Sequence, residues 1–431
     1  MRHPLPTLAT LPRRLPAVLP GVRLGALLLA GLLAQGVAHA EGREIDLESP
    51  PAGAETWASA CSLRHAMCVH GAPGTVASAL LAALDALDRG WDVHTQALEL
   101  PPPEADAKPT WDAYLVDGVP EGGRAALSSR DPRGALDRGE SFGLIDRMAP
   151  PGCPLDVAAA RSLAWGSLLR AAPATDAGTA RAQTRMLARL ATACAGSEEP
   201  ERAFQAEPER TLVDPDGEAR SSGASLFFDW VDGTFAGQPG ALVVGTWALA
   251  PTTTAPAAWR WTARPTGFDV LGSSLAGALG TDSNLDDVFL QFGIDRGLAL
   301  PPARVAWHVA WPAHARRLAS PVAVAPSGTS YVLVDHAGAP AGANLRVEAM
   351  WEDYGRMKWA VVKLDAAGRP LAVLRVTSQP RATSTALTVE LIDAVDRFLI
   401  VGVNVGSTEH TFDPGQGWWE PHGWVLTLSA G

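Results

Sequence analysis

Two cysteines and two histidines near the start of the chain have residue types and a spacing that could do chemistry. Cys61, His65, Cys68 and His70 lie within ten residues of one another, and sulfur and imidazole are ligands that zinc prefers. The same cysteines could instead form a disulfide, which an oxidising compartment favours over a metal site. Because the first residues are typical of an exported protein, we predict a Cys61–Cys68 disulfide and no metal here.

The chain has four cysteines, so three disulfide pairings are possible. Cys61 and Cys68 are close in sequence, which favours joining them and leaves Cys153 to pair with Cys194. The second bridge would tie the start of one expected helix to the end of the next. A bridge of that loop length adds roughly 2–4 kcal/mol of stability.

Export is indicated by residues 1–40. Four arginines and no acids precede or flank an apolar run, and Ala38-His39-Ala40 gives the small-x-small pattern of a cleavage site. Cleavage would leave 31 basic and 46 acidic residues, a formal charge of 31 − 46 = −15. Such a balance disfavours nucleic acid as a partner. We therefore expect a secreted protein, extracellular or periplasmic, with no membrane span after signal cleavage.

The helix pair at residues 155–171 and 176–194 is the centre of the first half of the chain, because its apolar residues recur at helical spacing. The elements expected before it are, in order, a strand, a helix and two strands: 67–70, 76–90, 111–117 and 141–146. Beyond it, residues 196–220 are charged and predict an exposed loop, and residues 221–232 predict a third strong helix.

Residues after 301 follow a different pattern, with short alternating runs separated by turns. Seven strands in about 125 residues are typical of an antiparallel β-sandwich: 330–335, 345–351, 358–364, 371–376, 386–392, 398–405 and 424–428. We therefore expect an α+β domain followed by an all-β antiparallel sandwich. The expected boundaries are a signal peptide at 1–40, a loose leader at 41–60, the α+β domain at 61–300 and the sandwich at 301–431.

Three smaller groups were weighed as sites. Asp282, Asn284 and Asp286 alternate as at the start of a calcium loop, but the required glycine and final glutamate are missing, so a helix cap is favoured. His308 and His314 are six residues apart, and packing at the domain junction is favoured over metal binding.

Two adjacent tryptophans follow a glycine-rich turn near the C-terminus. Trp418 and Trp419 could fill the core of the sandwich, which is the favoured reading, or could stack on a sugar or grip a partner if exposed. They are the possible binding residues of this half of the chain.

Taken in order, these elements resemble those of secreted bacterial metalloproteases of the zincin class, a group best known from myxobacteria. The resemblance rests on the order of elements and on several phrases: residues 68–70, 111–117, 223–230, 286–292 and 325–334. It covers most of the mature chain. It implies a zincin-like domain at 61–300, with zinc held by a His-Glu-x-x-His motif on the first central helix.

The residues that this resemblance would need are absent. Laid on residues 157–166, the motif places Ala160 and Ala164 at the histidines and Arg161 at the glutamate, with Arg181 near the third ligand. No histidine or glutamate occurs between residues 155 and 194. Alanine and arginine cannot coordinate a divalent cation. The resemblance therefore implies the scaffold without zinc or any other cofactor and without catalytic residues.

The helix pair carries positive charge in place of metal ligands, from Arg161, Arg181 and Arg185. Solvated arginines on helix faces are the favoured reading, and pairing with acids or an anion site in the old cleft are the alternatives.

Three functions remain open from the sequence. The first is a secreted zincin-like pseudoprotease that binds an unknown protein or glycan partner or plays a structural role. The second is an active hydrolase or metalloprotease with non-standard catalytic residues. The third is a carbohydrate- or surface-binding protein that uses the sandwich.

Overall fold

The computed structural model describes residues 47–105, 108–131, 138–173, 175–194, 196–213, 218–249, 266–279, 285–299, 303–340, 342–353, 355–376, 381–390, 394–407 and 421–431. They belong to one compact unit, Glu41–Gly431. The expected signal peptide and the Trp418-Trp419 pair lie outside these ranges. Across these ranges, no helix combines the length and the apolar character that a bilayer span requires.

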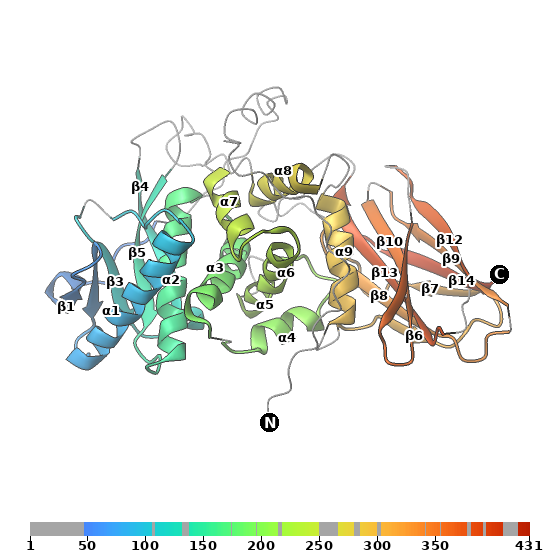
Figure 1. Cartoon of the computed structure of the whole chain (residues 1–431), viewed down its shortest axis with the longest axis horizontal. Helices are drawn as coiled ribbons and strands as arrows, with labels where there is room; N and C mark the ends of the chain where they lie inside the picture. The colour runs from blue at the N-terminus through green and yellow to red at the C-terminus, as the bar shows by residue number, and fades with distance from the viewer. Residues whose placement is uncertain are drawn as a thin grey trace, which may run out of the picture. The chain divides into compact units, whose positions relative to one another are not determined.

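The first half of the chain builds a five-stranded mixed sheet (Figure 1). Its order is β1-β2-β3-β5-β4, in which β2, β3 and β5 run parallel and the edge strands β1 and β4 run antiparallel to their neighbours. The strands are β1 (Ala58–Cys61), β2 (Met67–Gly71), β3 (Trp111–Val116), β4 (Gly123–Asp131) and β5 (Arg138–Asp146). The expected strands are β2, β3 and β5, and sequence reasoning missed both edge strands.

Two helices, α1 (Ala77–Trp91) and α2 (Cys153–Ala171), cover one face of this sheet (Figure 1). α3 (Ala177–Thr192) packs against α2 and begins with Asp176, whose side chain accepts a hydrogen bond from the Thr179 amide at 2.8 Å. The structure therefore contains the central helix pair that the sequence predicts, and this pair lies beside a mixed sheet.

Both predicted disulfides are confirmed. Cys61 is joined to Cys68 across the β1–β2 hairpin, and Cys153 at the start of α2 is joined to Cys194 just after α3. The second bridge holds the helix pair together at one end.

The other face of the sheet is covered by the residues expected to form a loose leader. From residue 47 on this segment is packed: Ala54 is buried, and the Trp57 ring contacts Tyr114 edge-on with ring centroids 6.1 Å apart. The Glu48 amide also donates to the Leu127 carbonyl of β4 at 2.7 Å. Aromatic burial, which a polar and Pro-rich composition conceals, is the reason that the segment is ordered.

In the part of the chain that the structure describes, six helices follow α3, and the first of them corrects the sequence prediction. Residues 196–220 were expected to be an exposed loop, yet α4 lies there and Phe204 is fully buried. The expected third helix is divided at Ala224 into two helices, and α4 approaches closely at Gly223, where an added Cβ would stand 1.9 Å from the Pro200 carbonyl oxygen. The helices are α4 (Glu199–Ala206), α5 (Glu218–Gly223), α6 (Ser225–Phe235), α7 (Ala241–Leu249), α8 (Gly267–Leu279) and α9 (Leu285–Leu298).

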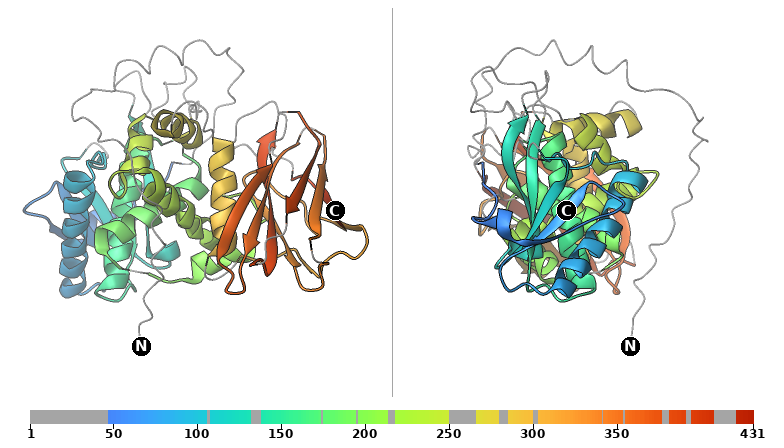
Figure 2. Two further views of the ribbon diagram at one scale, coloured as in Figure 1. Left: turned by 45° about the vertical axis from the view of Figure 1, so that its right-hand side comes forward. Right: turned by 90° about the vertical axis from the view of Figure 1, so that its left-hand side faces the viewer.

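The last third of the chain is a β-sandwich, as predicted (Figure 2). One sheet has the order β11-β10-β13-β8-β6 and the other β12-β9-β14-β7, and all pairs are antiparallel except β6 with β8. All seven expected strands are present, and β6 and β7 are additional. The strands are β6 (Trp307–Val309), β7 (Arg316–Ala319), β8 (Thr329–Asp335), β9 (Asn344–Trp351), β10 (Gly355–Leu364), β11 (Pro370–Val376), β12 (Ser384–Glu390), β13 (Arg397–Ser407) and β14 (Trp424–Ala430).

The helical region and the sandwich share one apolar core. α9 packs on the outer face of β8, β10 and β13, and the Tyr331 hydroxyl donates to the Gly293 carbonyl at 2.7 Å. Glycines let the helix approach closely, since a Cβ at Gly297 would stand 2.6 Å from the Tyr331 ring. The boundary expected at residues 300 and 301 lies outside the described residues, and the core on either side of it is continuous.

Candidate functional site

α2 is the helix on which the zinc ligands were expected, and it is buried along most of its length. Ala158 and Leu163 face the sheet and α1, whereas Ala164 and Leu168 face the helices that follow α3. A helix enclosed on all sides positions its few polar side chains rigidly, because each must find a partner inside the protein.

Ala160 and Ala164, the expected histidine positions, are both fully buried. Ala160 faces α1: a Cβ added at Gly90 would stand 3.4 Å from the Ala160 Cα. The two alanines therefore line packed interfaces. An imidazole at Ala160 would not fit unless α1 moved.

Arg161 is not solvated, which corrects the sequence prediction. Its side chain is 4% exposed and forms an ion pair with Glu121, and its guanidinium donates to the Ser222 hydroxyl at 3.0 Å. The Ser222 hydroxyl also donates to Glu121, so three side chains from three distant segments close a small network.

The loop that carries Glu121 is pressed onto α2. Glu121 has φ 52°, a left-handed backbone conformation that is uncommon outside glycine, and it precedes β4. At Gly123 an added Cβ would stand 2.0 Å from the Ala158 carbonyl oxygen, so only glycine allows this approach. The strained backbone and the close contact together aim the carboxylate at Arg161.

Burial lowers the pKa of the Arg161 guanidinium, and the Glu121 carboxylate opposes that shift; the positive charges of Arg185 and Arg181 add to it. The Arg161 Nε and Glu121 Oε1 atoms are buried without a hydrogen-bond partner among the described residues. The network therefore relies on the attraction between opposite charges more than on complete hydrogen bonding among the described residues.

Trp165 is a residue of this site that sequence reasoning missed. It lies four residues after Arg161, and its ring centroid is 5.8 Å from the guanidinium carbon. Residues four apart share a helix face. Arg161 and Trp165 are thus a four-apart pair on one side of α2, which a motif register moved by one residue would have selected.

The other two arginines differ from each other. Arg185 is buried and forms an ion pair with Glu201 of α4 at 2.9 Å, and its guanidinium also donates to the Ser197 carbonyl at 2.5 Å. Arg181 is half-buried on the same helix. The fork of Arg185 is occupied by a carboxylate, so it does not offer an anion site.

The described part of the chain brings no three His, Cys, Asp or Glu side chains together as a metal site would require. Asp286, which was weighed as a calcium ligand, forms an ion pair with Arg356 instead. His308 lies 2.9 Å from Asp335, and His314 is exposed.

A second polar cluster lies on the opposite face of the sheet. His70 Nε2 is 3.0 Å from Asp112, the Lys108 ammonium is 2.6 Å from the same carboxylate, and the His70 ring stacks on Tyr114. Burial alone would raise the pKa of Asp112, but its hydrogen bonds to His70 and Lys108 outweigh burial and lower that pKa. The Asp112 carboxylate is thus paired with the Lys108 ammonium and lies beside the His70 ring, as in a structural ion pair.

The tryptophans that the structure describes in the sandwich mostly fill its core, and the prediction for Trp418 and Trp419 lies outside the described residues. Trp351, Trp359 and Trp424 are buried, and the last two pack edge-to-face with ring centroids 5.9 Å apart. The outward-facing residues of β12, β9 and β14 that the structure describes include no aromatic ring. A sugar platform would therefore depend on Trp418 and Trp419, which lie outside the described residues.

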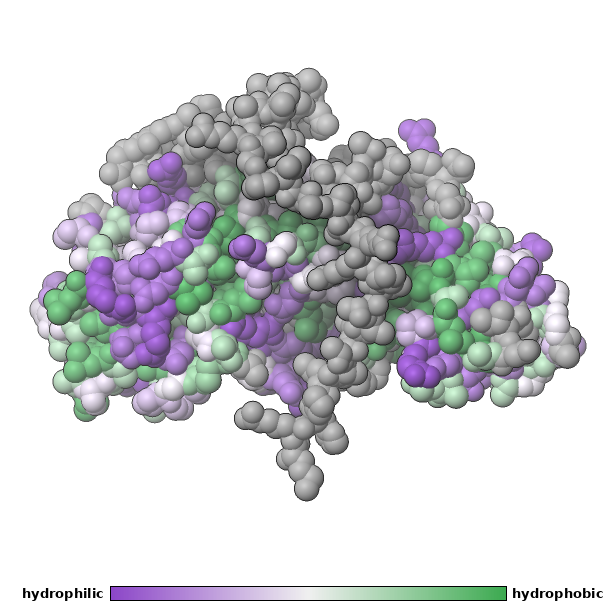
Figure 3. Space-filling view, in the orientation of Figure 1, coloured by the Kyte–Doolittle hydropathy of each residue, from purple (hydrophilic) through white to green (hydrophobic). Residues whose placement is uncertain are grey.

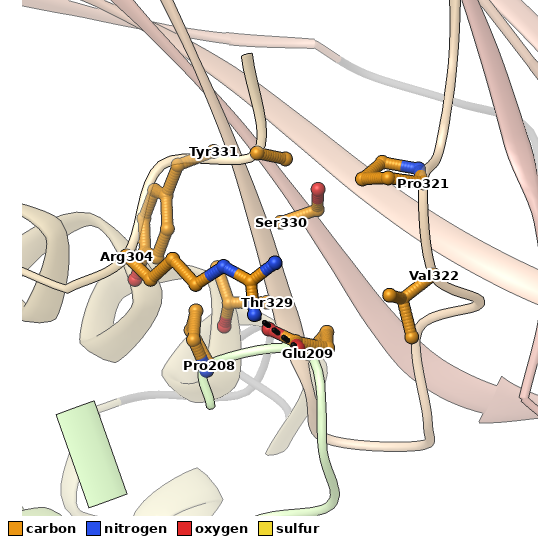
Figure 4. A pocket seen from close by; sticks show the side chains of 9 residues that line it. Pro208, Glu209, Arg304, Pro321, Val322, Thr329, Ser330 and Tyr331 are labelled. Atoms are coloured by element: carbon orange, nitrogen blue, oxygen red, sulfur yellow. Dashed lines mark ion pairs between the residues drawn. The ribbon is translucent and has the colours of Figure 1, made fainter. Parts of the chain in front are cut away.

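A pocket opens where residues 207–213 meet the start of β8 (Figure 4). Arg304 and Glu209 lie 3.7 Å apart across it, with Thr329 and Ser330 beside them. It encloses about 290 Å³, part of which is open solvent. Its two charges already neutralise each other, and none of its lining residues belongs to α2.

His94 is a buried neutral imidazole that should make stability depend on pH. It lies in the π-helical turn Asp92–Ala97 after α1 and contacts the Leu187 carbonyl at 3.2 Å. Burial lowers its pKa to about 4, although the bond to Leu187 opposes the shift. The unfolded chain binds the proton near pH 6.5, so the folded state loses up to about 3 kcal/mol as the pH falls from 6.5 to 4.

Urea unfolding at several pH values tests this for the native chain and His94→Leu, which should lack the loss between about pH 7 and pH 5. Burial raises the pKa of Asp229 to about 6, so that group gains stability as the pH falls through 6, but it is common to both proteins and cancels. His314→Leu, at an exposed site, is the control. Parallel pH profiles for all three proteins would contradict the assignment.

Comparison with known proteins does not name a family for this chain. No family model matches it, and no curated protein matches its sequence.

Several solved structures match a part of the chain. The pre-peptidase C-terminal domain of a collagenase from Bacillus anthracis is 8% identical, with a TM-score of 0.19, over 29% of this chain and 97% of that one. A cleaved adhesin domain of Lys-gingipain from Porphyromonas gingivalis is 16% identical, with a TM-score of 0.16, over 24% and 64%. A chitosan-binding module from a Paenibacillus chitosanase/glucanase is 15% identical, with a TM-score of 0.16, over 26% and 75%. Likenesses this slight carry no argument about the chain.

Proposed function

We propose that this chain is an exported pseudoprotease: a zincin-like scaffold that acts by binding or as a structural component and not by zinc-dependent hydrolysis. The observation that carries the proposal is the enclosed ion pair of Arg161 with Glu121 on α2. A guanidinium offers only donors and remains protonated, so it cannot act as a metal ligand or as a general base.

Two features support the scaffold half of the proposal. A mixed sheet with an antiparallel edge strand lies against α1 and α2, and α3 pairs with α2 as the resemblance requires. Two features support the loss of activity. The space beside Ala160 is filled by α1, and the face that carries Arg161 and Trp165 is closed by the Glu121 loop and by Ser222.

An alternative, hydrolysis by non-standard residues, would need an activated nucleophile or a bound metal elsewhere. The His70–Asp112 pair is the nearest candidate for a base and its orienting acid, but Lys108 already neutralises Asp112. A binding role for the exported chain therefore remains the best supported.

Metal analysis and a peptidase assay on the same sample test the proposal. The purified, disulfide-intact chain is dialysed against zinc, then against metal-free buffer, and its zinc content and its cleavage of unfolded casein are measured. We expect far less than one zinc per chain and no cleavage above that of buffer. One retained zinc per chain, or cleavage that chelation abolishes and zinc restores, would overturn the proposal.

A variant that restores the ligand types tests whether zinc binding is prevented by the missing ligands or by the lack of space around them. Replacing Arg161 and Trp165 by histidine and Ser162 by glutamate restores the ligand types on α2 in the shifted register. Because the Glu121 loop and Ser222 still close that side of α2, we expect the variant to be destabilised and to bind no zinc stoichiometrically.

A further inference from the structure

Among the residues that the structure describes, no segment pairs with the outer edge of β1. Its four residues are Ala58, Ser59, Ala60 and Cys61, which are uncharged, small and largely exposed, and β1 ends the strand order of its sheet (Figure 1). An edge strand presents unpaired N–H and C=O groups to any second strand. Natural proteins usually guard such edges with charge, proline or a covering segment.

The other long edges that the structure describes carry those guards. The Glu48 amide covers the Leu127 carbonyl of β4. Exposed charged residues or proline occur on three further edge strands: Arg316 and Arg317 of β7, Pro370 and Arg375 of β11, and Glu390 of β12. β6, an edge strand of three residues, carries neither. β1 differs from β4, β7, β11 and β12 in this respect.

The hairpin tip beside β1 is rigid, and it presents one apolar side chain. The Ser62 hydroxyl donates to Asp88 at 2.6 Å and accepts from the Arg64 amide at 3.0 Å, and Arg64 lies 2.9 Å from Asp92. The Cys61–Cys68 bridge closes the loop. Within this fixed frame, Leu63 is fully exposed, so it would lose little conformational entropy on docking.

The surroundings of this tip are polar. The face of α1 next to it carries charged side chains, which gather over that helix in the space-filling view (Figure 3).

We propose that β1 pairs with β1 of a second copy of this chain, antiparallel across a two-fold axis at Ala60. A two-fold axis normal to the sheet keeps the faces of the two sheets aligned. In this register Ala60 opposes Ala60, and Leu63 of each copy lies opposite Trp57 of the other.

In the proposed dimer, apolar side chains meet at both ends of the paired strands, and no like charges lie opposite each other along them. Trp57 is half-buried on Tyr114, so one side of its ring remains open to Leu63 of the other copy. Glu55 lies beyond one end of β1 and Arg64 beyond the other, so opposite charges approach twice across the axis. Arg64 keeps Asp92 as a partner, and the charges therefore favour the orientation more than the affinity.

Sedimentation velocity of the mature chain over a concentration series tests the proposal. We expect a reversible dimer with a dissociation constant of about 10–100 µM, because this contact is far smaller than the ~1,600 Å² of a standard interface. Leu63→Ser should raise the dissociation constant at least tenfold. Leu81→Ser is the matched control, since Leu81 is an exposed leucine on α1 away from the edge.

Cross-linking tests the register. With Ala60→Cys, the Cα atoms of the paired residues would be about 4.5–5.5 Å apart, within reach of a disulfide. Mild oxidation should then join the two copies through position 60, as peptide mapping without reduction would show, whereas Ala77→Cys, at an exposed site on α1, should not cross-link. A chain that stays monomeric throughout, or equal behaviour of the two leucine variants, would overturn the proposal.

Discussion

Replacing Glu121 by alanine will cost the protein about 3–5 kcal/mol of folding free energy, because Arg161 is left buried without its counter-charge. The Arg161 side chain is 4% exposed and the Glu121 side chain 19%, so water cannot take over the solvation of the guanidinium. The Ser222 hydroxyl remains as a neutral acceptor, but it loses its own acceptor in the variant. Urea unfolding measures the change as a shift of the midpoint.

The double variant Glu121→Ala/Arg161→Met removes both charges and separates charge burial from damage to the loop. If the unpaired charge causes the loss, the double variant should recover to within about 1 kcal/mol of the native chain, since apolar replacements of a buried pair are often neutral. If the double variant stays as unstable as the single one, the Glu121 loop itself is what the carboxylate supports.

Glu198→Ala provides the matched surface control. Glu198 pairs with Arg202 at 2.7 Å, and both side chains are more than two-thirds exposed. Its loss should change stability by less than about 1 kcal/mol. Equal effects at Glu121 and Glu198 would mean that the α2 pair is solvated, and the argument that its charge takes the place of metal ligands would fail.

Features of the sequence that depend on local pattern were predicted well. The alternating runs after residue 301 gave all seven expected strands, because alternation reports which face of a strand is buried. The disulfides followed from spacing and compartment. Asp176 at the start of α3 caps that helix through contacts only three residues away.

Features that depend on distant contacts were not predictable. α4 is charged on its exposed side, and only the packing of Phe204 against Phe292 reveals that it is a helix in the core. The partners of Arg161 lie 40 and 61 residues away in sequence. The sequence therefore predicted that Arg161, an arginine among alanines, is exposed to solvent, because no local pattern points to Glu121.

The residues that form the network on α2 were not predicted, for a related reason. The motif laid on this helix places Ala160 and Ala164 at the two histidines, but which residues meet at a site depends on what packs against each side of the helix. Gly90 of α1 packs on Ala160, and the polar network forms around Arg161. A helix buried on all sides has no apolar stripe from which the register could be read.

Removing the Cys153–Cys194 bridge will cost the protein about 4 kcal/mol, more than removing Cys61–Cys68, which should cost about 2 kcal/mol. The two bridges span 41 and 7 residues, and a longer loop withdraws more conformational entropy from the unfolded chain. The comparison uses Cys153→Ala/Cys194→Ala against Cys61→Ala/Cys68→Ala, so that neither protein carries a free thiol.

The same two double variants also show whether each disulfide acts on the entropy of the unfolded chain or on contacts in the folded protein. Each bridge joins an exposed cysteine to a buried one, Cys153 to Cys194 and Cys61 to Cys68, so lost packing alone would make the two bridges about equally costly. Urea midpoints measured under identical conditions decide between these outcomes. If the shorter bridge proves the costlier, the hairpin that presents Leu63 is stabilised chiefly in the folded state, and the helix pair holds its place by packing and by the Arg161 network without needing its covalent tie.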